Sequence, residues 1–238
     1  MLIASFNYIR SWLPFTARNH PLSAYSSPTL LHCIIVGYAN TNTVQKFNQI
    51  TPIFVDVADS SGYNICNLGS NFSSGDTIQI FNKDGNVEVT LTWKTRKGNT
   101  GWHNAGNDYL TNYIIAKGKC VWIYTAAPIS ITESGEVFNK EYTLTFGQKF
   151  NQAGNPTPVD LKLSQLEFAG LTSGDTIQIF NKDGNVETTY TWKTRKGNTG
   201  WHNAANDYIP DQIVPAGQAF WVYCANAGAT MKVPKIID

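Results

Sequence analysis

The 238-residue sequence predicts an all-β protein of two tandem antiparallel β-sandwich domains, Ig-like or jelly-roll-like, preceded by an N-terminal arm. Three observations predict this fold class. A long block of sequence occurs twice, apolar and polar side chains alternate with period two inside each copy, and turn-forming residues return about every 8 to 12 residues. The apolar spacing that is typical of amphipathic helices does not occur in either copy.

An internal repeat sets the domain organisation, because residues 74–126 recur without a gap as residues 173–225. The stretches SGDTIQIFNKDGNVE and TWKTRKGNTGWHNA are unchanged, whereas AKGKCVWIY becomes PAGQAFWVY. A weaker match continues upstream, so the unit has about 100 residues, the size of a complete sandwich rather than of a solenoid repeat. No linker rich in Pro, Gly or Ser separates the units, which predicts a short, stiff junction. The expected segments are an arm at residues 1–43, a first unit at 44–135 and a second at 136–238.

Strand and turn patterns justify the elements of each unit. Residues 87–93 alternate between apolar and polar side chains and predict a half-buried strand. Asp84 and Gly85 precede it in a short hairpin turn, which the second copy repeats at Asp183. Residues 120–124 are apolar on both faces and therefore predict a central strand that is covered on both sides.

The N-terminal segment allows two interpretations. It is a signal peptide if Arg10 and Arg18 form the basic region and residues 37–39 the small-x-small cleavage site. Alternatively, its β-prone part adds to a sheet edge, in its own domain or in the next subunit, and repetition of the latter contact gives a filament. The residues expected to make this contact are Leu30, Leu31, Ile34, Ile35, Val36 and Tyr38.

Composition excludes several classes of protein. The 18 basic and 17 acidic residues leave a net charge of +1 without a basic stretch that could follow a phosphate backbone, so nucleic acid is not an expected partner. No apolar run approaches the roughly 20 residues of a membrane-spanning helix. Cys33 and Cys66 could form a disulfide between arm and domain or remain free thiols, and no cysteine spacing indicates zinc. We expect no metal and no cofactor.

The polar cluster around a repeated Trp-His pair is the best candidate site. A surface loop in which the tryptophan only covers the sandwich is the simplest interpretation. The ring could instead stack on a sugar while polar neighbours bind hydroxyl groups, or the histidine and aspartate could act as an acid–base pair. The last reading lacks a nucleophile or a second carboxylate at a suitable spacing. The candidate ligand-binding residues are Trp102, His103 and Asp108, with Trp201, His202 and Asp207 in the second copy.

Three smaller motifs of the sequence contain polar or charged residues. Residues 94–98 and 193–197 are basic and face either solvent, acidic glycans or carboxylates of a partner. Residues 82–85 resemble part of a calcium loop, but a lysine among them and too few oxygen ligands favour a hairpin turn. Asn71 begins a glycosylation sequon, which matters only if the chain passes through a compartment that attaches glycans.

The second copy contains a series of short motifs, GNPTPVD at residues 154–160, GDTI at 174–177 and PAGQAFWV at 215–222. In this series the chain resembles a β-sandwich module that is repeated in secreted and surface proteins of environmental bacteria. The resemblance covers residues 149–232 and weakens in the first copy, where Thr51 and Pro52 stand in place of the Gly-Asn-Pro segment. It implies a sandwich fold, an extracellular or cell-surface location and a non-catalytic role in adhesins and appendages.

Together these observations predict a non-catalytic extracellular structural protein, a subunit of a fibre or surface assembly joined through the arm and sheet edges. Self-association into a homopolymer is the expected partnership, with glycans as further candidate ligands. The alternative is a tandem carbohydrate-binding module, which requires Trp102 and Trp201 to be accessible to solvent.

Overall fold

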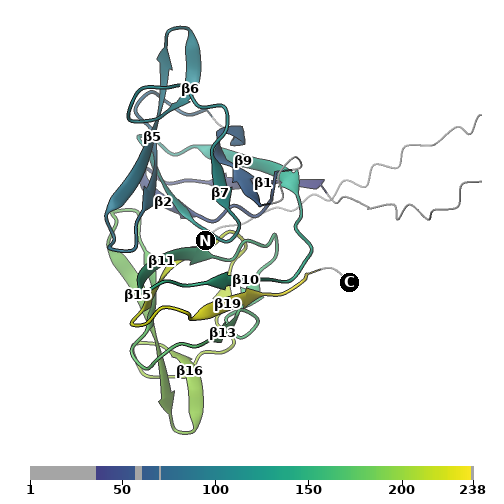
Figure 1. The fold of residues 1–238 in the computed structure, drawn as a ribbon, viewed down its shortest axis with the longest axis vertical. Coiled ribbons are helices and arrows are strands. Elements are labelled where there is room, and N and C mark those ends of the chain that lie inside the picture. The colour runs from purple at the N-terminus through teal and green to yellow at the C-terminus, as the bar shows by residue number, and fades with distance from the viewer. Residues whose placement is uncertain (1–35, 57–60, 70, 237–238) are drawn as a thin grey trace, which may run out of the picture.

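The computed structural model describes residues 36–56, 61–69 and 71–236, and these residues form two β-units stacked along the long axis of the molecule (Figure 1). The all-β prediction is confirmed, since strands and turns make up the described residues apart from one 3-10 turn, η1, at Ile65–Asn67. No helix among them is long and apolar enough to cross a membrane.

The first unit has a five-stranded antiparallel sheet in the order β2-β8-β4-β5-β6, faced by the two-stranded sheets β1-β9 and β3-β7. Its strands are β1 (Val36–Asn42), β2 (Lys46–Ile50), β3 (Gly62–Asn64), β4 (Thr77–Phe81), β5 (Val87–Arg96), β6 (Asn99–His103), β7 (Ile114–Ala116), β8 (Val121–Thr125) and β9 (Ser130–Glu136).

The second unit repeats this plan with the sheet β11-β18-β14-β15-β16, faced by β10-β19-β13 and β12-β17. Its strands are β10 (Tyr142–Thr145), β11 (Lys149–Gly154), β12 (Leu161–Lys162), β13 (Glu167–Ala169), β14 (Thr176–Phe180), β15 (Val186–Arg195), β16 (Asn198–His202), β17 (Ile213–Val214), β18 (Ala219–Cys224) and β19 (Thr230–Val233).

The described part of the expected arm is a strand of the first unit. β1 pairs antiparallel with β9 of the same chain, with Val36 opposite Glu136 and Tyr38 opposite Ser134. It holds the place that β10 holds beside β19 in the second unit. Leu30, Leu31, Ile34 and Ile35, the remaining residues of the expected arm contact, lie outside the described residues.

Buried aspartates at the start of β4 and β14 explain the Gly-Asp motif of both copies. The Asp76 carboxylate accepts hydrogen bonds from the backbone N–H groups of Ser73 at 2.8 Å and Ala126 at 3.0 Å. Asp175 repeats both bonds, accepting from the N–H groups of Thr172 and Ala225 at 2.8 Å each. Each aspartate therefore connects the turn before β4 or β14 to the end of the neighbouring strand in the sheet, β8 or β18. It also satisfies donors that burial would otherwise leave unpaired.

The central strands β8 and β18 are covered on both faces, as their sequence predicts, but the second cover is the other unit. Val121 and Ile123 point into the core of the first unit, whereas Trp122 points to the opposite face. There it meets Trp221 at a ring-centroid distance of 6.1 Å and Phe180 at 5.2 Å. Trp122 and Trp221 thus build a shared aromatic core between the units.

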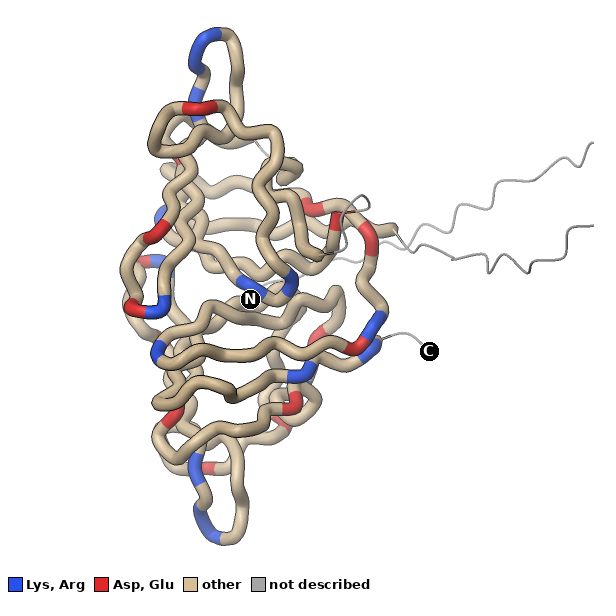
Figure 2. The backbone as a smooth tube through the Cα atoms, viewed as in Figure 1, with Lys and Arg blue, Asp and Glu red and all other residues tan. Residues whose placement is uncertain are grey.

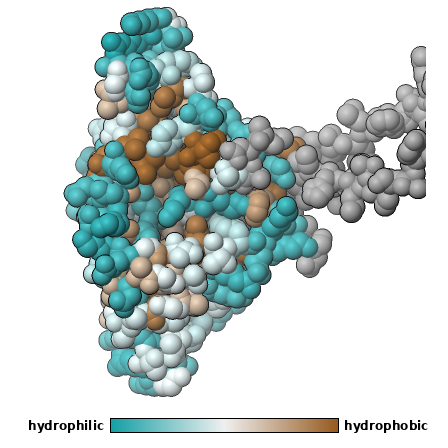
Figure 3. Space-filling view, in the orientation of Figure 1, coloured by the Kyte–Doolittle hydropathy of each residue, from teal (hydrophilic) through white to brown (hydrophobic). Residues whose placement is uncertain are grey.

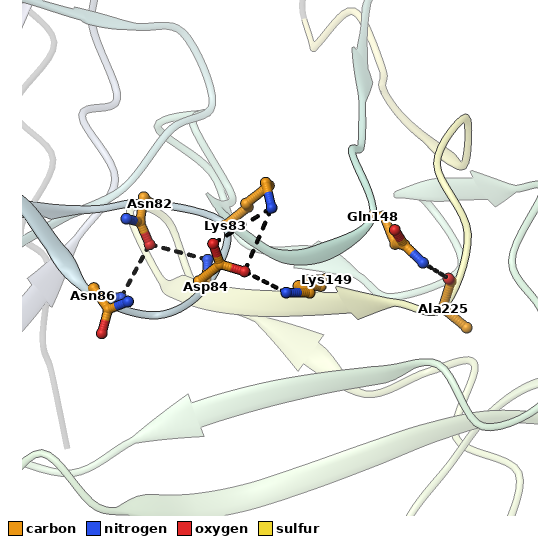
Figure 4. A network of polar contacts seen from close by, with 7 residues as sticks. All are labelled: Asn82, Lys83, Asp84, Asn86, Gln148, Lys149 and Ala225. Carbon is orange, nitrogen blue, oxygen red and sulfur yellow. Dashed lines mark hydrogen bonds and ion pairs between the residues drawn. The ribbon is translucent and has the colours of Figure 1, made fainter.

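Contacts around this aromatic core come in matched pairs. The backbone N–H of Phe47 donates to the carbonyl oxygen of Lys182, and that of Phe150 donates to the carbonyl oxygen of Lys83, both at 3.0 Å. Lys46 and Lys149 form ion pairs with Asp183 and Asp84, respectively. Figure 4 shows Asp84, at the turn of the first unit, reaching Lys149 of the second. The two units are therefore related by an approximate two-fold arrangement, the isologous geometry of a symmetric dimer, here within one chain.

Candidate functional site

The unchanged stretch TWKTRKGNTGWHNA folds as a hairpin at the end of each unit. β5 and β6 are joined through Lys97 and Gly98, whose φ angles of 50° and 84° are those of a type I′ turn. Arg96 pairs with Asn99 across this turn. In Figure 1 the hairpins β5-β6 and β15-β16 form the two opposite ends of the molecule, and Figure 2 shows basic residues at both.

A polar loop follows each hairpin and packs against it. The Asn104 side chain accepts a hydrogen bond from the N–H of Asp108 at 2.9 Å and donates to the Asp108 carboxylate at 3.0 Å. Tyr109 returns alongside the hairpin, where a Cβ on Gly101 would lie only 2.7 Å from its ring. We call residues 94–100 with 104–109 the first tip, and residues 193–199 with 203–208 the second tip.

The tryptophans proposed as sugar platforms are buried. Trp102 is 1% exposed and packs on Phe72 and Trp93, with ring centroids 4.8 and 5.2 Å away. Trp201 is 4% exposed in the matching place. The two rings therefore lack the solvent accessibility that the carbohydrate-binding alternative requires, and they pack into the cores of the two units.

The structure also separates the histidine and aspartate that the sequence suggested as an acid–base pair. His103 is buried, and its Nδ1 lies 2.9 Å from the carbonyl oxygen of Gly101. Asp108 lies in the exposed loop, where its carboxylate binds Asn104. His202 and Asp207 repeat this arrangement with Gly200 and Asn203. The imidazoles therefore brace the hairpin backbone rather than face the neighbouring carboxylates.

The side chains left at the surface of the first tip are mainly cationic. Arg96 and Lys97 are exposed at the turn, and the ammonium group of Lys94 contacts the side-chain oxygen of Asn107. Tyr109 is 42% exposed beside them. With Asp108 as the one carboxylate, the first tip carries three cations against one anion, and the second tip has the same composition.

The cysteines and the glycosylation sequon were the remaining candidates from the sequence. Cys66, Cys120 and Cys224 are free thiols, and Cys33, the expected partner of Cys66, lies outside the described residues. Burial raises the pKa of Cys66 to about 11 and that of Cys120 to about 12, which disfavours their reactive thiolate forms. Asn71 is exposed.

The calcium-like segment forms a hairpin turn. The Asn82 side-chain oxygen accepts hydrogen bonds from the N–H groups of Asp84 at 3.0 Å and Asn86 at 3.1 Å. The Asp84 carboxylate is engaged by Lys149 and Lys83. Within the described part of the chain, no group of three or more His, Cys, Asp or Glu side chains converges as a metal site.

The junction contains features that sequence reasoning missed. A cleft of about 480 Å³ lies between the units, lined by Phe81, Tyr113 and Lys119 of the first and by Phe150 and Gln152 of the second. Figure 3 shows apolar surface over β7, which borders this cleft. No local sequence pattern predicts such a cleft, because residues from both units form it.

Lys117 is a further junction residue without a counterpart, since Ala216 stands at its place in the second copy. Its ammonium group lies over the ring of Phe138 and 4.7 Å from the ring centroid of Tyr142. Burial lowers the pKa of this lysine to about 7. The contact fastens the first unit to the segment that leads into the second.

No protein-family model, curated protein or solved structure matches this chain.

Proposed function

We propose that the chain is a non-catalytic extracellular structural protein, a subunit that joins copies of itself into a fibre or surface assembly. The observation that carries this proposal is the outer edge of β1. The resemblance of the second unit to modules of surface proteins supports the extracellular location, and the aromatic junction supports a stiff subunit.

β1 is an edge strand whose partner β9 lies on one side only. Thr43, in the same register, donates its N–H to Ile129 at 2.9 Å. Hydrogen bonds alternate along an antiparallel strand, so the main-chain groups of Tyr38 and Asn40 point to the outer edge. Among the described residues no strand pairs with that edge.

The composition of β1 offers little protection against pairing with another chain. Its seven residues, VGYANTN, include neither a charged residue nor proline, and Val36 is 60% exposed. The equivalent strand β10 has four residues and follows Lys140 and Glu141. Short strands and charges are the usual means of blocking edge-to-edge association, so the two units differ in this respect.

The test is negative-stain electron microscopy and mass photometry of the full chain beside a variant with Tyr38→Lys and Asn40→Lys. Both side chains are exposed, so the variant should fold. We expect assemblies from the unchanged chain and monomers from the variant. The matched control carries Thr143→Lys and Thr145→Lys on β10, also at exposed positions, and should still assemble.

A chain that starts at Val36 separates the edge of β1 from the residues before it. Assembly of this shortened chain supports the edge contact. The proposal fails if the unchanged chain is monomeric, or if shortening abolishes assembly while the lysine variant of β1 still assembles.

A further inference from the structure

We propose that the two tips are equivalent binding sites for an anionic polysaccharide, so that one chain can bridge two polymer strands. This inference does not depend on the edge of β1. It comes from an unusual distribution of differences between the two units and from the chemistry of the tip surface.

The tip residues have changed less than several residues in the cores of the two units. Residues 92–109 match residues 191–208 at 17 of 18 positions, and the exception is Gly106, which is Ala205 in the second copy. Residues 95–100 and 105–109 are exposed. By contrast, the buried Val121 and Ile123 correspond to Phe220 and Val222.

This distribution is the reverse of what packing alone would produce, because surface substitutions usually cost little and core substitutions cost more. The other unchanged stretch, residues 74–88, has a structural explanation. It contains the Asp84 turn that contacts the opposite unit, and the same turn is needed on both sides of the junction. The tips lie at the far ends from that junction (Figure 2), so the junction does not explain why they are identical.

The exposed groups of a tip suit an acidic sugar polymer. Arg96, Lys97 and Lys94 can form charge-assisted hydrogen bonds to carboxylate or sulfate groups. The half-exposed ring of Tyr109 offers a flat surface to a pyranose, and the amide of Asn99 and the hydroxyl of Thr100 can bind sugar hydroxyl groups. The type I′ turn fixes the spacing of these groups on a rigid hairpin.

The placement of the tips at opposite ends of the molecule determines how one chain can bind a polysaccharide. The two tips of one chain cannot bind the same short segment of polysaccharide, because the two units and their junction lie between the tips (Figure 1). A polymer with repeated anionic groups would therefore be cross-linked even by the monomeric protein, and a monomeric single-tip variant would bind it without cross-linking.

Isothermal titration calorimetry with a short oligogalacturonate measures the number of sites on the full chain. We expect two sites in the unchanged chain, one after Arg96→Ala with Lys97→Ala, and one after Arg195→Ala with Lys196→Ala. The four-residue variant should bind roughly tenfold more weakly or not at all. The control removes two exposed lysines elsewhere, Lys140→Ala with Lys235→Ala. Its net charge changes by as much as that of each single-tip variant, but it should keep both sites.

Polymer probes identify the anionic group and test cross-linking by light scattering. Polygalacturonate offers carboxylates, dextran sulfate offers sulfate esters, and uncharged dextran serves as the neutral reference. The scattering is measured in the Tyr38→Lys, Asn40→Lys background, so that the proposed β1 contact cannot make a single-tip chain multivalent. Scattering that appears with either anionic polymer in this background and is lost in each single-tip variant supports the proposal. Equal binding of uncharged dextran, equal loss in the lysine control, or binding of duplex DNA but of neither acidic polysaccharide would overturn it.

Discussion

Glu133 is a single carboxyl group inside the core of the first unit. It is 2% exposed, and its carboxyl oxygen accepts a hydrogen bond from the N–H of Ile53 at 3.0 Å. Burial raises its pKa from 4.5 to about 7. Between these two values the folded chain holds a proton that the unfolded chain has lost, so the free energy of unfolding falls as the pH rises through this range.

Replacing Glu133 by glutamine should remove this penalty while keeping a hydrogen-bond acceptor for Ile53. We expect little change in the free energy of unfolding at pH 4.5 and a gain of about 3 kcal/mol at pH 8. Urea unfolding across this pH range measures the difference. Glu141→Gln, at an exposed position, is the control. A gain that does not vary with pH would show that the carboxyl group is already ionised in the folded chain.

At the scale of elements, the alternating pattern of residues 87–93 and the Asp-Gly turns were sufficient to predict the hairpins, because these signals are local. Residues 120–124 indicated a strand covered on both sides. The sequence could not predict that the other unit covers the second face of this strand. The residues beside Trp122 in the sequence are the same whether its ring packs inside one unit or against another. A tryptophan covering the sandwich was the simplest interpretation of the repeated Trp-His pair. The burial of His103 was not predicted, because the polar loop that follows it in sequence suggested an exposed site.

The hairpin at each tip depends on a glycine with little room around it. Gly101 has a φ of 153°, and a Cβ there would lie 2.7 Å from the ring of Tyr109. Gly101→Ala should therefore displace Tyr109 and lower the free energy of unfolding by about 1 to 3 kcal/mol. Gly200→Ala, against Tyr208 in the second copy, should cost the same. Thermal unfolding of both variants checks this, and a cost in only one copy would contradict the equivalence of the tips.

At the scale of the whole molecule, the aromatic core makes the two units one body. Trp122→Ala removes a buried ring that contacts Phe180 and Trp221 of the second unit. We expect a loss of about 3 to 5 kcal/mol in the free energy of unfolding. Lys46→Ala breaks only an exposed ion pair at the rim and should cost far less, because solvent screens it. Similar losses in the two urea unfolding curves would show that the rings do not hold the units together.

The face-to-face junction supports both the stiff subunit and the opposed tips, and hydrogen exchange of single amides by NMR tests it most directly. The N–H groups of Phe47, Thr51 and Phe150 donate across the junction, to Lys182, Gly217 and Lys83, each at 3.0 Å. We predict that these three amides exchange as slowly as those of the central strands β4 and β14. Exchange at the rate of exposed amides, while β4 and β14 stay protected, would contradict the junction and the opposed placement of the tips.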